Sequence, residues 1–507
     1  MRRAVLLTVA MLAPVLRGGV VHGVVLEHTS GLALARAKVS LEVLSDFQLK
    51  PFAAILSGRR GEFVFPSVPP GYYVLSAVRG GFAKATYGQK RSNGPGFPIP
   101  VTADSEIFIE LRLRRLGAIS GRVLDENRVG LPDISVLAYP VALPLRIAAE
   151  AKTDDRGIFR IPGLRPGRYF VRSGAHELAD KQGLAPTYAP ETALTRDAKI
   201  VKGDLDYEEM DVNLHPLPGR LFRLSGFVKN CREWHSATVT LSSDTGRRQT
   251  KVQCGGRYTF ENLAPGDYEL LGEHQSEENK IPLNLSAHLE LFLDSTNDSV
   301  HVELRDTPVV AFGVDRRDTS GLRLDRAAVQ IRRKDLAGES EPRPAEPKMR
   351  LQPGYWELTA APPPSHYFKD VDAPGWRRRS KAGQHPDWYE FYIEPRWGGS
   401  VGVSFSSRPA TLAGVVALRK KPVCGAPVFL FPVTAETRRR MNGMKTAFTD
   451  AEGRYQFEGL APGRYLVLSS FDFGEIGEEI LVDANAPSVL LEDGQAGALD
   501  LTLYEAP

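Results

Sequence analysis

The residues with the clearest binding chemistry in this sequence are tryptophans that fall close together in its second half. Trp356, Trp376, Trp388 and Trp397 lie within one segment, and Tyr389 stands beside the third of them. Indole and phenol rings stack on sugar rings, and arginines placed between them can form paired hydrogen bonds with carboxylates. The segment therefore points to binding of a ligand.

Two tyrosines in Gly/Pro-rich loops could act in the same way. Tyr87 lies in "FAKATYGQKRSNGPGFPIP" and Tyr188 in "HELADKQGLAPTYAPETA". Loops held by a rigid scaffold often carry binding residues. We expect ligand-binding residues at Tyr87, Tyr188, Trp376, Trp388, Tyr389 and Trp397. The alternative is that these rings pin long loops onto sheets or fill joints between modules, since "WYEFYIEPRW" is also typical of a strand with an aromatic inner face.

Motifs for catalysis are not found in the sequence. It contains no H-E-x-x-H, G-x-S-x-G or P-loop. His274 and Glu277 fit H-x-x-E by chance in a polar stretch, the ten histidines are scattered, and no C-x-x-C pair offers a zinc site. We therefore predict that the protein is not an enzyme and that it uses no cofactor and no metal.

A sequence motif that occurs five times, called here the repeated phrase, indicates how the scaffold is organised. "GRYQFEGLAPGRYLVLS" at 453–469 has full copies at 157–173, 256–272 and 61–77, and a degraded copy, "KMRLQPGYWELTA", at 348–360. A second landmark precedes each copy, around Gly23, Gly121, Gly226, Gly313 and Gly414. Both landmarks recur at intervals of roughly 100 residues, a normal domain size. Tandem modules that each bury their own core are therefore expected.

The phrase itself reads as turn, strand, turn, strand. Asp and Gly in "TDDRG" and "TDAEG" favour tight turns, and alternating apolar residues follow them. Pro-Gly suits a type II turn with the glycine at positive φ. An aromatic stands two residues after that glycine in every copy: Tyr73, Tyr169, Tyr268, Trp356 and Tyr465. We expect this aromatic to be buried scaffold with its polar atom bonded to nearby backbone, because that is the usual role of such a ring in β-sandwiches.

The modules resemble a known family. "ISGRVLDENRVGLP" followed by "TDDRGIFRIPGLRPGRYFV" in the second module is similar to the carboxypeptidase regulatory-like domain, whereas the fourth module keeps little beyond "LQPGYWEL". The resemblance implies a transthyretin-like β-sandwich related to carbohydrate-binding folds, with a role in binding or spacing at the cell exterior and no chemistry of its own. The fold class predicted is all-β, a tandem array of about five Greek-key sandwiches.

The predicted organisation begins with a secretory signal. Arg2 and Arg3 precede an apolar run from Ala4 to Leu16, which is too short to span a membrane. We expect a signal peptide at 1–19 and modules at 20–116, 117–221, 222–308, 309–408 (divergent) and 409–507. The product should be secreted, periplasmic or attached to the cell surface, without a membrane span.

Charge and cysteine content limit the partners. A net charge of +3, from 64 basic and 61 acidic residues, gives no reason to expect nucleic acid. Cys231 and Cys254 could pair in an oxidising compartment, leaving Cys424 free; three unpaired cysteines are the alternative. The function predicted is non-catalytic binding of carbohydrate or of a protein or peptide at the cell surface. The alternatives are a spacer or adhesin-like stalk and, last, an enzyme with an unrecognised site.

Overall fold

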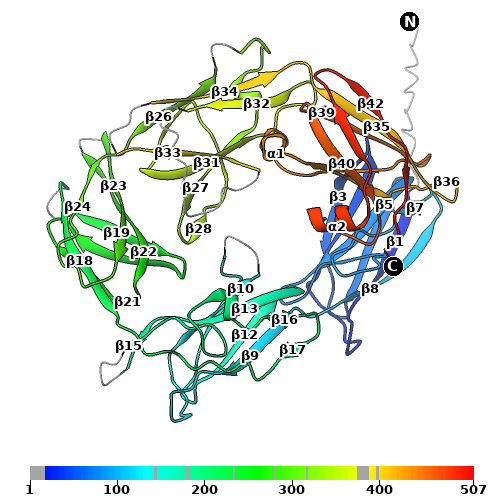
Figure 1. The fold of residues 1–507 in the computed structure, drawn as a ribbon. Coiled ribbons are helices and arrows are strands. Elements are labelled where there is room, and N and C mark those ends of the chain that lie inside the picture. Colours follow the sequence, from blue (N-terminus) through cyan, green and yellow to red (C-terminus); the bar gives the residue numbers. More distant parts are fainter. Residues whose placement is uncertain are drawn as a thin grey trace, which may run out of the picture.

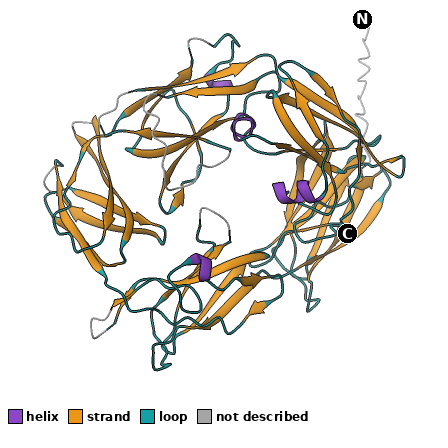
Figure 2. Cartoon of the chain, in the orientation of Figure 1, coloured by secondary structure: helices purple, strands orange, loops and turns teal. Residues whose placement is uncertain are grey.

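The fold is built almost wholly from β-strands (Figure 2). The computed structural model describes residues 18–141, 145–178, 183–231, 235–278, 281–315, 318–373, 387–395, 399–474 and 476–506. The helices in this part are short: α1 (Ala435–Met441), α2 (Glu478–Asp483) and the 3₁₀ turns η1 (Thr195–Asp197) and η2 (Leu324–Arg326). The all-β class predicted from the sequence is confirmed.

Module 1 packs two sheets against each other. Its strands are β1 (Gly19–Glu27), β2 (Lys38–Ser45), β3 (Gln48–Leu56), β4 (Glu62–Val68), β5 (Gly71–Val78), β6 (Ala85–Thr86), β7 (Ile99–Val101) and β8 (Glu106–Leu113). One sheet has the order β4-β1-β8 and the other the order β3-β2-β5-β6, with β7 also paired to β5. The apolar faces enclose a core of their own.

Module 2 repeats this plan. Its strands are β9 (Gly117–Arg122), β10 (Ser135–Pro140), β11 (Ala149–Lys152), β12 (Ile158–Leu164), β13 (Gly167–Ser173), β14 (His176–Glu177), β15 (Gly183–Leu184), β16 (Val201–Gly203) and β17 (Glu208–Glu209). The sheets run β12-β9-β17 and β11-β10-β13-β16, and β14-β15 form a small hairpin.

Module 3 carries the longest strands. They are β18 (Phe222–Lys229), β19 (Ser236–Ser243), β20 (Gly246–Gln253), β21 (Arg257–Leu263), β22 (Gly266–Glu278), β23 (Ile281–Leu293), β24 (Val302–Glu303) and β25 (Arg305–Asp306). Its sheets run β21-β18-β24 and β20-β19-β22-β23-β25. The structure joins Cys231 and Cys254 in a disulfide here, the pairing that the sequence left open, and Cys424 is free.

Module 4, the divergent copy, keeps both sheets. Its strands are β26 (Val309–Val314), β27 (Val329–Asp335), β28 (Gly338–Glu339), β29 (Arg343–Pro344), β30 (Lys348–Arg350), β31 (Gly354–Ala360), β32 (Tyr367–Asp372), β33 (Tyr389–Ile393) and β34 (Ser400–Ser406). The orders are β30-β26-β34-β32 and β28-β27-β31-β33, with β29 also paired to β27.

Module 5 completes the series. Its strands are β35 (Ala410–Leu418), β36 (Lys421–Pro422), β37 (Pro427–Pro432), β38 (Lys445–Phe448), β39 (Arg454–Leu460), β40 (Gly463–Ser469), β41 (Ser488–Leu491), β42 (Ala496–Ala498) and β43 (Leu501–Thr502). One sheet runs β36-β35-β39, with β42 and β43 also paired to β35, and the other runs β38-β37-β40-β41.

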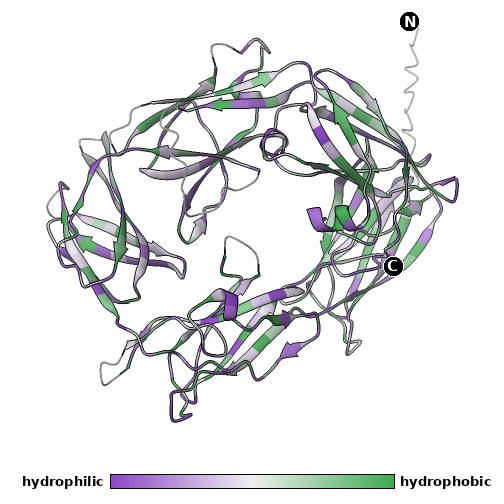
Figure 3. Cartoon of the chain, viewed as in Figure 1, coloured by the Kyte–Doolittle hydropathy of each residue, from purple (hydrophilic) through white to green (hydrophobic). Residues whose placement is uncertain are grey.

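One topology underlies all five modules. The first strand pairs antiparallel with the strand that begins the repeated phrase and parallel with a strand from the end of the module, as in β1 with β4 and β8. In modules 1 to 4 the second strand pairs with the strand that begins at the phrase's glycine, as in β2 with β5; in module 5 the third strand, β37, pairs with β40 in the same way. Apolar residues alternate with polar ones along many of these strands (Figure 3). The expected tandem β-sandwiches are thus confirmed, while the module boundaries named above stay a proposed division.

The repeated aromatic makes the same hydrogen bond in every module. The hydroxyls of Tyr73, Tyr169, Tyr268 and Tyr465 donate to the carbonyl four residues earlier at 2.9, 2.8, 2.8 and 2.5 Å. In module 4 the indole Nε1–H of Trp356 donates to Gln352 O at 2.9 Å, so tryptophan replaces the phenol donor as well as its bulk. This geometry supports the scaffold role.

The type II turn expected at Pro-Gly is not found in modules 1, 2, 3 and 5, whereas Gly354 of module 4 keeps a positive φ of 120°. Gly71 and Gly167 have no positive φ, and Gly266 and Gly463, at φ 158°, are nearly extended. Each glycine is instead the first residue of its strand. A β-carbon at Gly71 would lie 3.3 Å from the Tyr73 ring, which folds back to reach its carbonyl. At Gly167 the corresponding distance to the Tyr169 ring is 3.6 Å, and at Gly266 nothing lies within 4 Å, so the ring crowds the glycine position only in module 1.

Replacing Tyr465 by phenylalanine is expected to destabilise module 5 by about 1–2 kcal/mol, because the buried Ala461 carbonyl loses its donor. Hydrogen exchange of the β37 and β40 amides measures the change. Tyr504→Phe is the control, since the structure shows no hydrogen bond from that hydroxyl within the described residues. Equal protection in the two variants would contradict the expectation.

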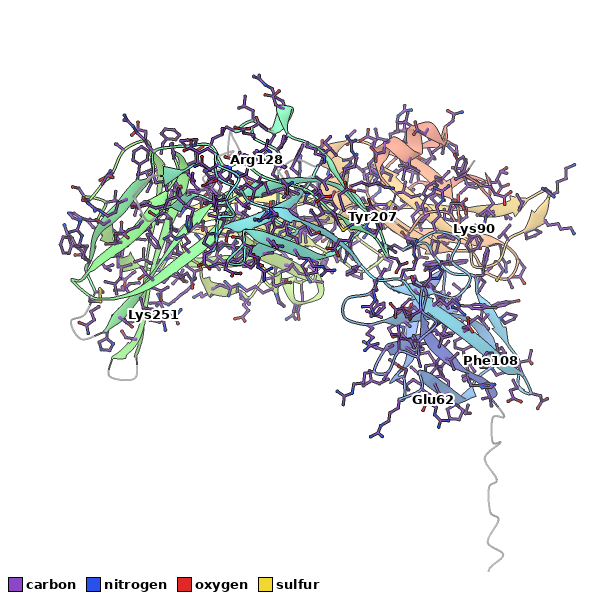
Figure 4. All side chains as sticks on the ribbon, turned by 90° about the horizontal axis from the view of Figure 1, so that it is seen from below. Glu62, Lys90, Phe108, Arg128, Tyr207 and Lys251 are labelled. Atoms are coloured by element: carbon purple, nitrogen blue, oxygen red, sulfur yellow. A yellow bond between two sulfur atoms is a disulfide. The ribbon has the colours of Figure 1, made fainter. Side chains whose placement is uncertain are left out.

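The modules follow one another around a ring that closes between its two ends (Figure 1). The amide of Phe448 donates to Phe47 O at 2.8 Å, and the rings of Phe97 and Phe471 lie 4.5 Å apart. Lys90, placed where modules 1 and 5 meet (Figure 4), lies 3.7 Å from both Asp472 and Glu505. The first and last modules therefore contact each other directly.

Candidate functional site

Tyr87 is held at the surface by the backbone around it. It follows the short strand β6; its amide donates to Leu75 O at 2.9 Å, and its carbonyl accepts from Phe97 N at 3.0 Å. The residue is 40% exposed. A fixed backbone with a free ring is the arrangement that a stacking platform requires.

A basin of about 630 Å³ opens beside this ring. Its charged lining residues are Lys90, Arg91, Glu110, Arg112 and Arg114. Arg112 Nε pairs with Glu110 Oε1 at 2.6 Å, and Arg114 Nε pairs with Asp206 Oδ2 of module 2 at 2.6 Å. The basin thus combines an aromatic face with hydrogen-bonding groups that ion pairs hold in place.

Arg91 is the most available of the basic groups in the basin. It is exposed, and its guanidinium lies 5.5 Å from the ring centre of Phe473 in module 5. Lys90, beside it, is shared between Asp472 and Glu505. The basin therefore lies next to the contact that closes the ring.

Tyr188 lies in a different environment, buried in module 2 beside its contact with module 3. It is only 5% exposed, and the guanidinium of Arg172 lies 5.2 Å from its ring centre. Arg172 also pairs with Asp244 of module 3 at 2.8 Å, and burial raises the pKa of Tyr188. These contacts favour the packing role that the sequence left as the alternative.

A second hollow, of about 580 Å³, lies between modules 2 and 3 and is lined by three arginines. Arg172 pairs with Asp244, Arg247 makes two bonds to Asp335 at 2.7 and 2.8 Å, and Arg248 donates to Glu261 O at 2.6 Å. Arg172 thus bridges modules 2 and 3, Arg247 bridges modules 3 and 4, and Arg248 is bonded within module 3, so each of these cations already has a partner. The hollow is therefore a weaker candidate than the basin at Tyr87.

Trp388 and Tyr389 are buried in module 4. The guanidinium of Arg332 lies 4.1 Å from the ring centre of Trp388. Tyr389 belongs to the module's core, 5.2 Å from the ring of Phe368, and burial raises its pKa to about 12. Neither residue offers an open ring face in this structure.

Reasoning from the sequence missed a buried cluster of charges in module 4. Lys334 Nζ lies 2.7 Å from Glu390 Oε2 and 3.1 Å from Glu357 Oε1, and Arg332 Nη2 lies 2.6 Å from Glu357 Oε2. These residues project from neighbouring strands β27, β31 and β33. The alternating pattern of "VQIRRKD" predicts that Arg332 and Lys334 lie on the same face of the strand. It does not predict that this face is buried.

A set of possible metal donors lies at the joint of modules 3 and 4. Donor atoms of Glu269, His288 and Glu290 lie within 4.8 Å of one another. Burial, helped by the positive charge of Arg333, lowers the pKa of His288 to about 4. His288 also lies 3.3 Å from Tyr392 Oη of module 4. The positive charge of Arg333 already acts on this set, so we interpret the set as part of the polar contact between modules 3 and 4. The absence of a metal stays a prediction.

Two of the predicted ligand residues, Trp376 and Trp397, and most of the predicted signal peptide fall outside the part of the chain that the structure describes. Within the described ranges, no helix has the length and apolar character that crossing a membrane requires.

Comparison with protein-family models finds no match to this chain, and comparison with curated proteins finds none either. Among solved structures, the minor pilin GBS52 of Streptococcus agalactiae is similar at 13% identity and a TM-score of 0.26, covering 40% of this chain and 97% of that one. The major pilin BcpA of Bacillus cereus is similar at 8% identity and a TM-score of 0.16, covering 57% and 99%.

Proposed function

We propose that this chain is a non-catalytic, multi-domain binding protein of the cell exterior that binds carbohydrate at the basin around Tyr87. One observation carries the proposal. Of the four predicted ligand residues within the described part of the chain, Tyr87 alone is exposed, and it borders a hollow with fixed polar groups. The burial and contacts of Tyr188, Trp388 and Tyr389 favour packing instead.

The chemistry of the basin suits a sugar. An exposed phenol ring presents a flat apolar face that can cover the C–H face of a pyranose. The Arg112–Glu110 pair offers donors and acceptors side by side, which is what neighbouring hydroxyl groups require. A protein or peptide partner is the other outcome that a binding experiment can return. Trp376 and Trp397 stay predicted contributors.

Two finer assignments belong to the same proposal. Membership of the carboxypeptidase regulatory-like family is supported by the shared turn, strand and aromatic geometry of the repeated phrase, including the Asp154 and Asp450 turns. Export is supported by the Cys231–Cys254 disulfide, a bond typical of oxidising compartments.

A spacer or stalk is the second candidate function. Direct contacts between adjacent modules, such as Arg114 with Asp206 and Arg172 with Asp244, would suit a stiff array. The contacts between modules 1 and 5 favour a closed ring over an extended rod, however, so binding is preferred.

Replacing Tyr87 by alanine is expected to weaken carbohydrate binding at least about tenfold, since stacking worth about 1.4 kcal/mol is lost. A glycan array with the full chain identifies the ligand, and calorimetry compares the variants. Tyr72→Ala is the matched control, because Tyr72 lies in the same module at 36% exposure and does not line the basin. Unchanged affinity in Tyr87→Ala, or a wild-type chain that retains no glycan, would refute the proposal.

A further inference from the structure

A separate cavity lies where modules 1, 4 and 5 meet. It has a volume of about 460 Å³. Module 1 contributes Phe47 from its β2–β3 turn, module 4 contributes Pro362 and Tyr367, and module 5 contributes Lys445 and Phe457. The cavity exists only because the ring is closed, since Phe47 reaches it from the far end of the chain.

Three of the four charged residues that line the cavity already have partners. Asp46 is paired with Lys50. Arg440 pairs with Glu436 at 2.5 Å and donates to Lys369 O at 3.0 Å. Glu458 accepts a hydrogen bond from Gln456 at 2.7 Å.

Lys445 differs from these residues. Within the described part of the chain, no carboxylate lies within ion-pair distance of its ammonium group. Burial lowers the pKa of Lys445, and no neighbouring acid offsets that effect. An ammonium group that is partly removed from water without a counter-charge costs free energy, which a bound anion would recover.

The rest of the lining is apolar. Tyr367 is nearly buried and belongs with the core of module 5, against which Phe47 also packs. Pro362, Met441 and Phe457 add further apolar surface. A cavity with one unpaired cation and aromatic walls matches a ligand that carries an anionic group on an aromatic or aliphatic body.

We propose that this junction cavity binds a small organic anion, with the carboxylate or sulfonate on Lys445 and the apolar body between Phe47, Tyr367 and Phe457. The site is distinct from the Tyr87 basin and independent of carbohydrate binding. Because its walls come from the first module and the last two, such a ligand holds the ring closed.

The probe for the test is 8-anilinonaphthalene-1-sulfonate, which combines aromatic rings with a sulfonate and fluoresces when it leaves water. We expect the full chain to bind it saturably at one site, and Lys445→Met to weaken that binding at least tenfold. Lys445→Arg should stay within about threefold of wild type. Lys421→Met, an exposed lysine of the same module, is the control and should change nothing.

Thermal unfolding separates loss of the site from loss of the fold. Lys445→Met removes a charge without a partner, so its Tm should equal or exceed that of the wild type. Phe47→Ala should also weaken dye binding, because module 1 then no longer closes the cavity. The proposal is overturned if the dye binds Lys445→Met as tightly as wild type, if no saturable site exists, or if Lys445→Met lowers the Tm by several degrees.

Discussion

Replacing Lys334 by methionine is expected to lower the free energy of unfolding of module 4 by about 3–5 kcal/mol. The lysine ammonium lies between Glu357 and Glu390, at 3.1 and 2.7 Å, and the side chains of all three residues are at most 2% exposed. Without it, two carboxylates face each other on adjacent strands away from water.

Neighbouring side chains can recover only part of the free energy that Lys334→Met removes. Arg332 pairs with Glu357 but also lies over the Trp388 ring, so moving it toward Glu390 would give up that contact. Removing one member of a buried ionic group costs more than the group contributes, because the remaining charges keep their desolvation penalty. The effect should therefore exceed that of a typical core substitution.

Urea unfolding followed by tryptophan fluorescence reports on this module, because Trp356 and Trp388 both lie in it. Lys348→Met, an exposed lysine of β30, is the matched control and should stay within about 0.5 kcal/mol. Replacing Lys334, Glu357 and Glu390 together by apolar residues should recover much of the lost stability. A Lys334→Met chain within 1 kcal/mol of the wild type, on the scale of an ordinary surface change, would contradict this account of the cluster.

Patterns within one strand or one repeat were predictable from the sequence. Alternating apolar residues were expected after each tight turn, and Phe63 and Phe65, which hold these positions in module 1, are both buried. The aromatic after each Pro-Gly was expected to bond to nearby backbone, and it does. These features depend on local geometry, which the sequence determines over a few residues.

Features that depend on how modules sit against one another were not predictable. In the sequence there was the same reason to expect ligand binding at Tyr188 and Trp388 as at Tyr87. In the structure, however, arginine side chains cover the rings of Tyr188 and Trp388. Lys334 reads as a solvated residue because nothing in its own strand shows that its face is covered. The hydrogen bond between Phe448 N and Phe47 O joins the first module to the last, and no pattern in the sequence around either residue predicts it.

The glycine in the first strand of each module is needed for space in some copies and not in others. A β-carbon built on Gly23, Gly121, Gly226 or Gly414 would lie 1.8–2.2 Å from a carbonyl oxygen in the last segment of the module. At Gly313 of module 4 there is nothing within 4 Å. The repeat conserves glycine in all five copies, but only four of them lack space for a side chain.

Module 5 shows why the strand cannot move aside to make room. The Leu499 carbonyl, 1.9 Å from the β-carbon position on Gly414, accepts a hydrogen bond from the Tyr455 hydroxyl at 2.6 Å. The Leu499 amide donates to Ala413 O at 2.9 Å. Shifting this residue away from Gly414 would break both bonds at once.

Gly414→Ala is therefore expected to destabilise module 5 by about 3 kcal/mol, at the upper end of the cost of overpacking. Gly313→Ala should instead stabilise module 4 by roughly 0.5 kcal/mol, because alanine restricts the unfolded chain and meets no obstacle in the strand. Hydrogen exchange of β35 and β26 measures both changes in the full chain. Effects of the same sign at the two positions would mean that the approach of the last strand does not explain the glycine.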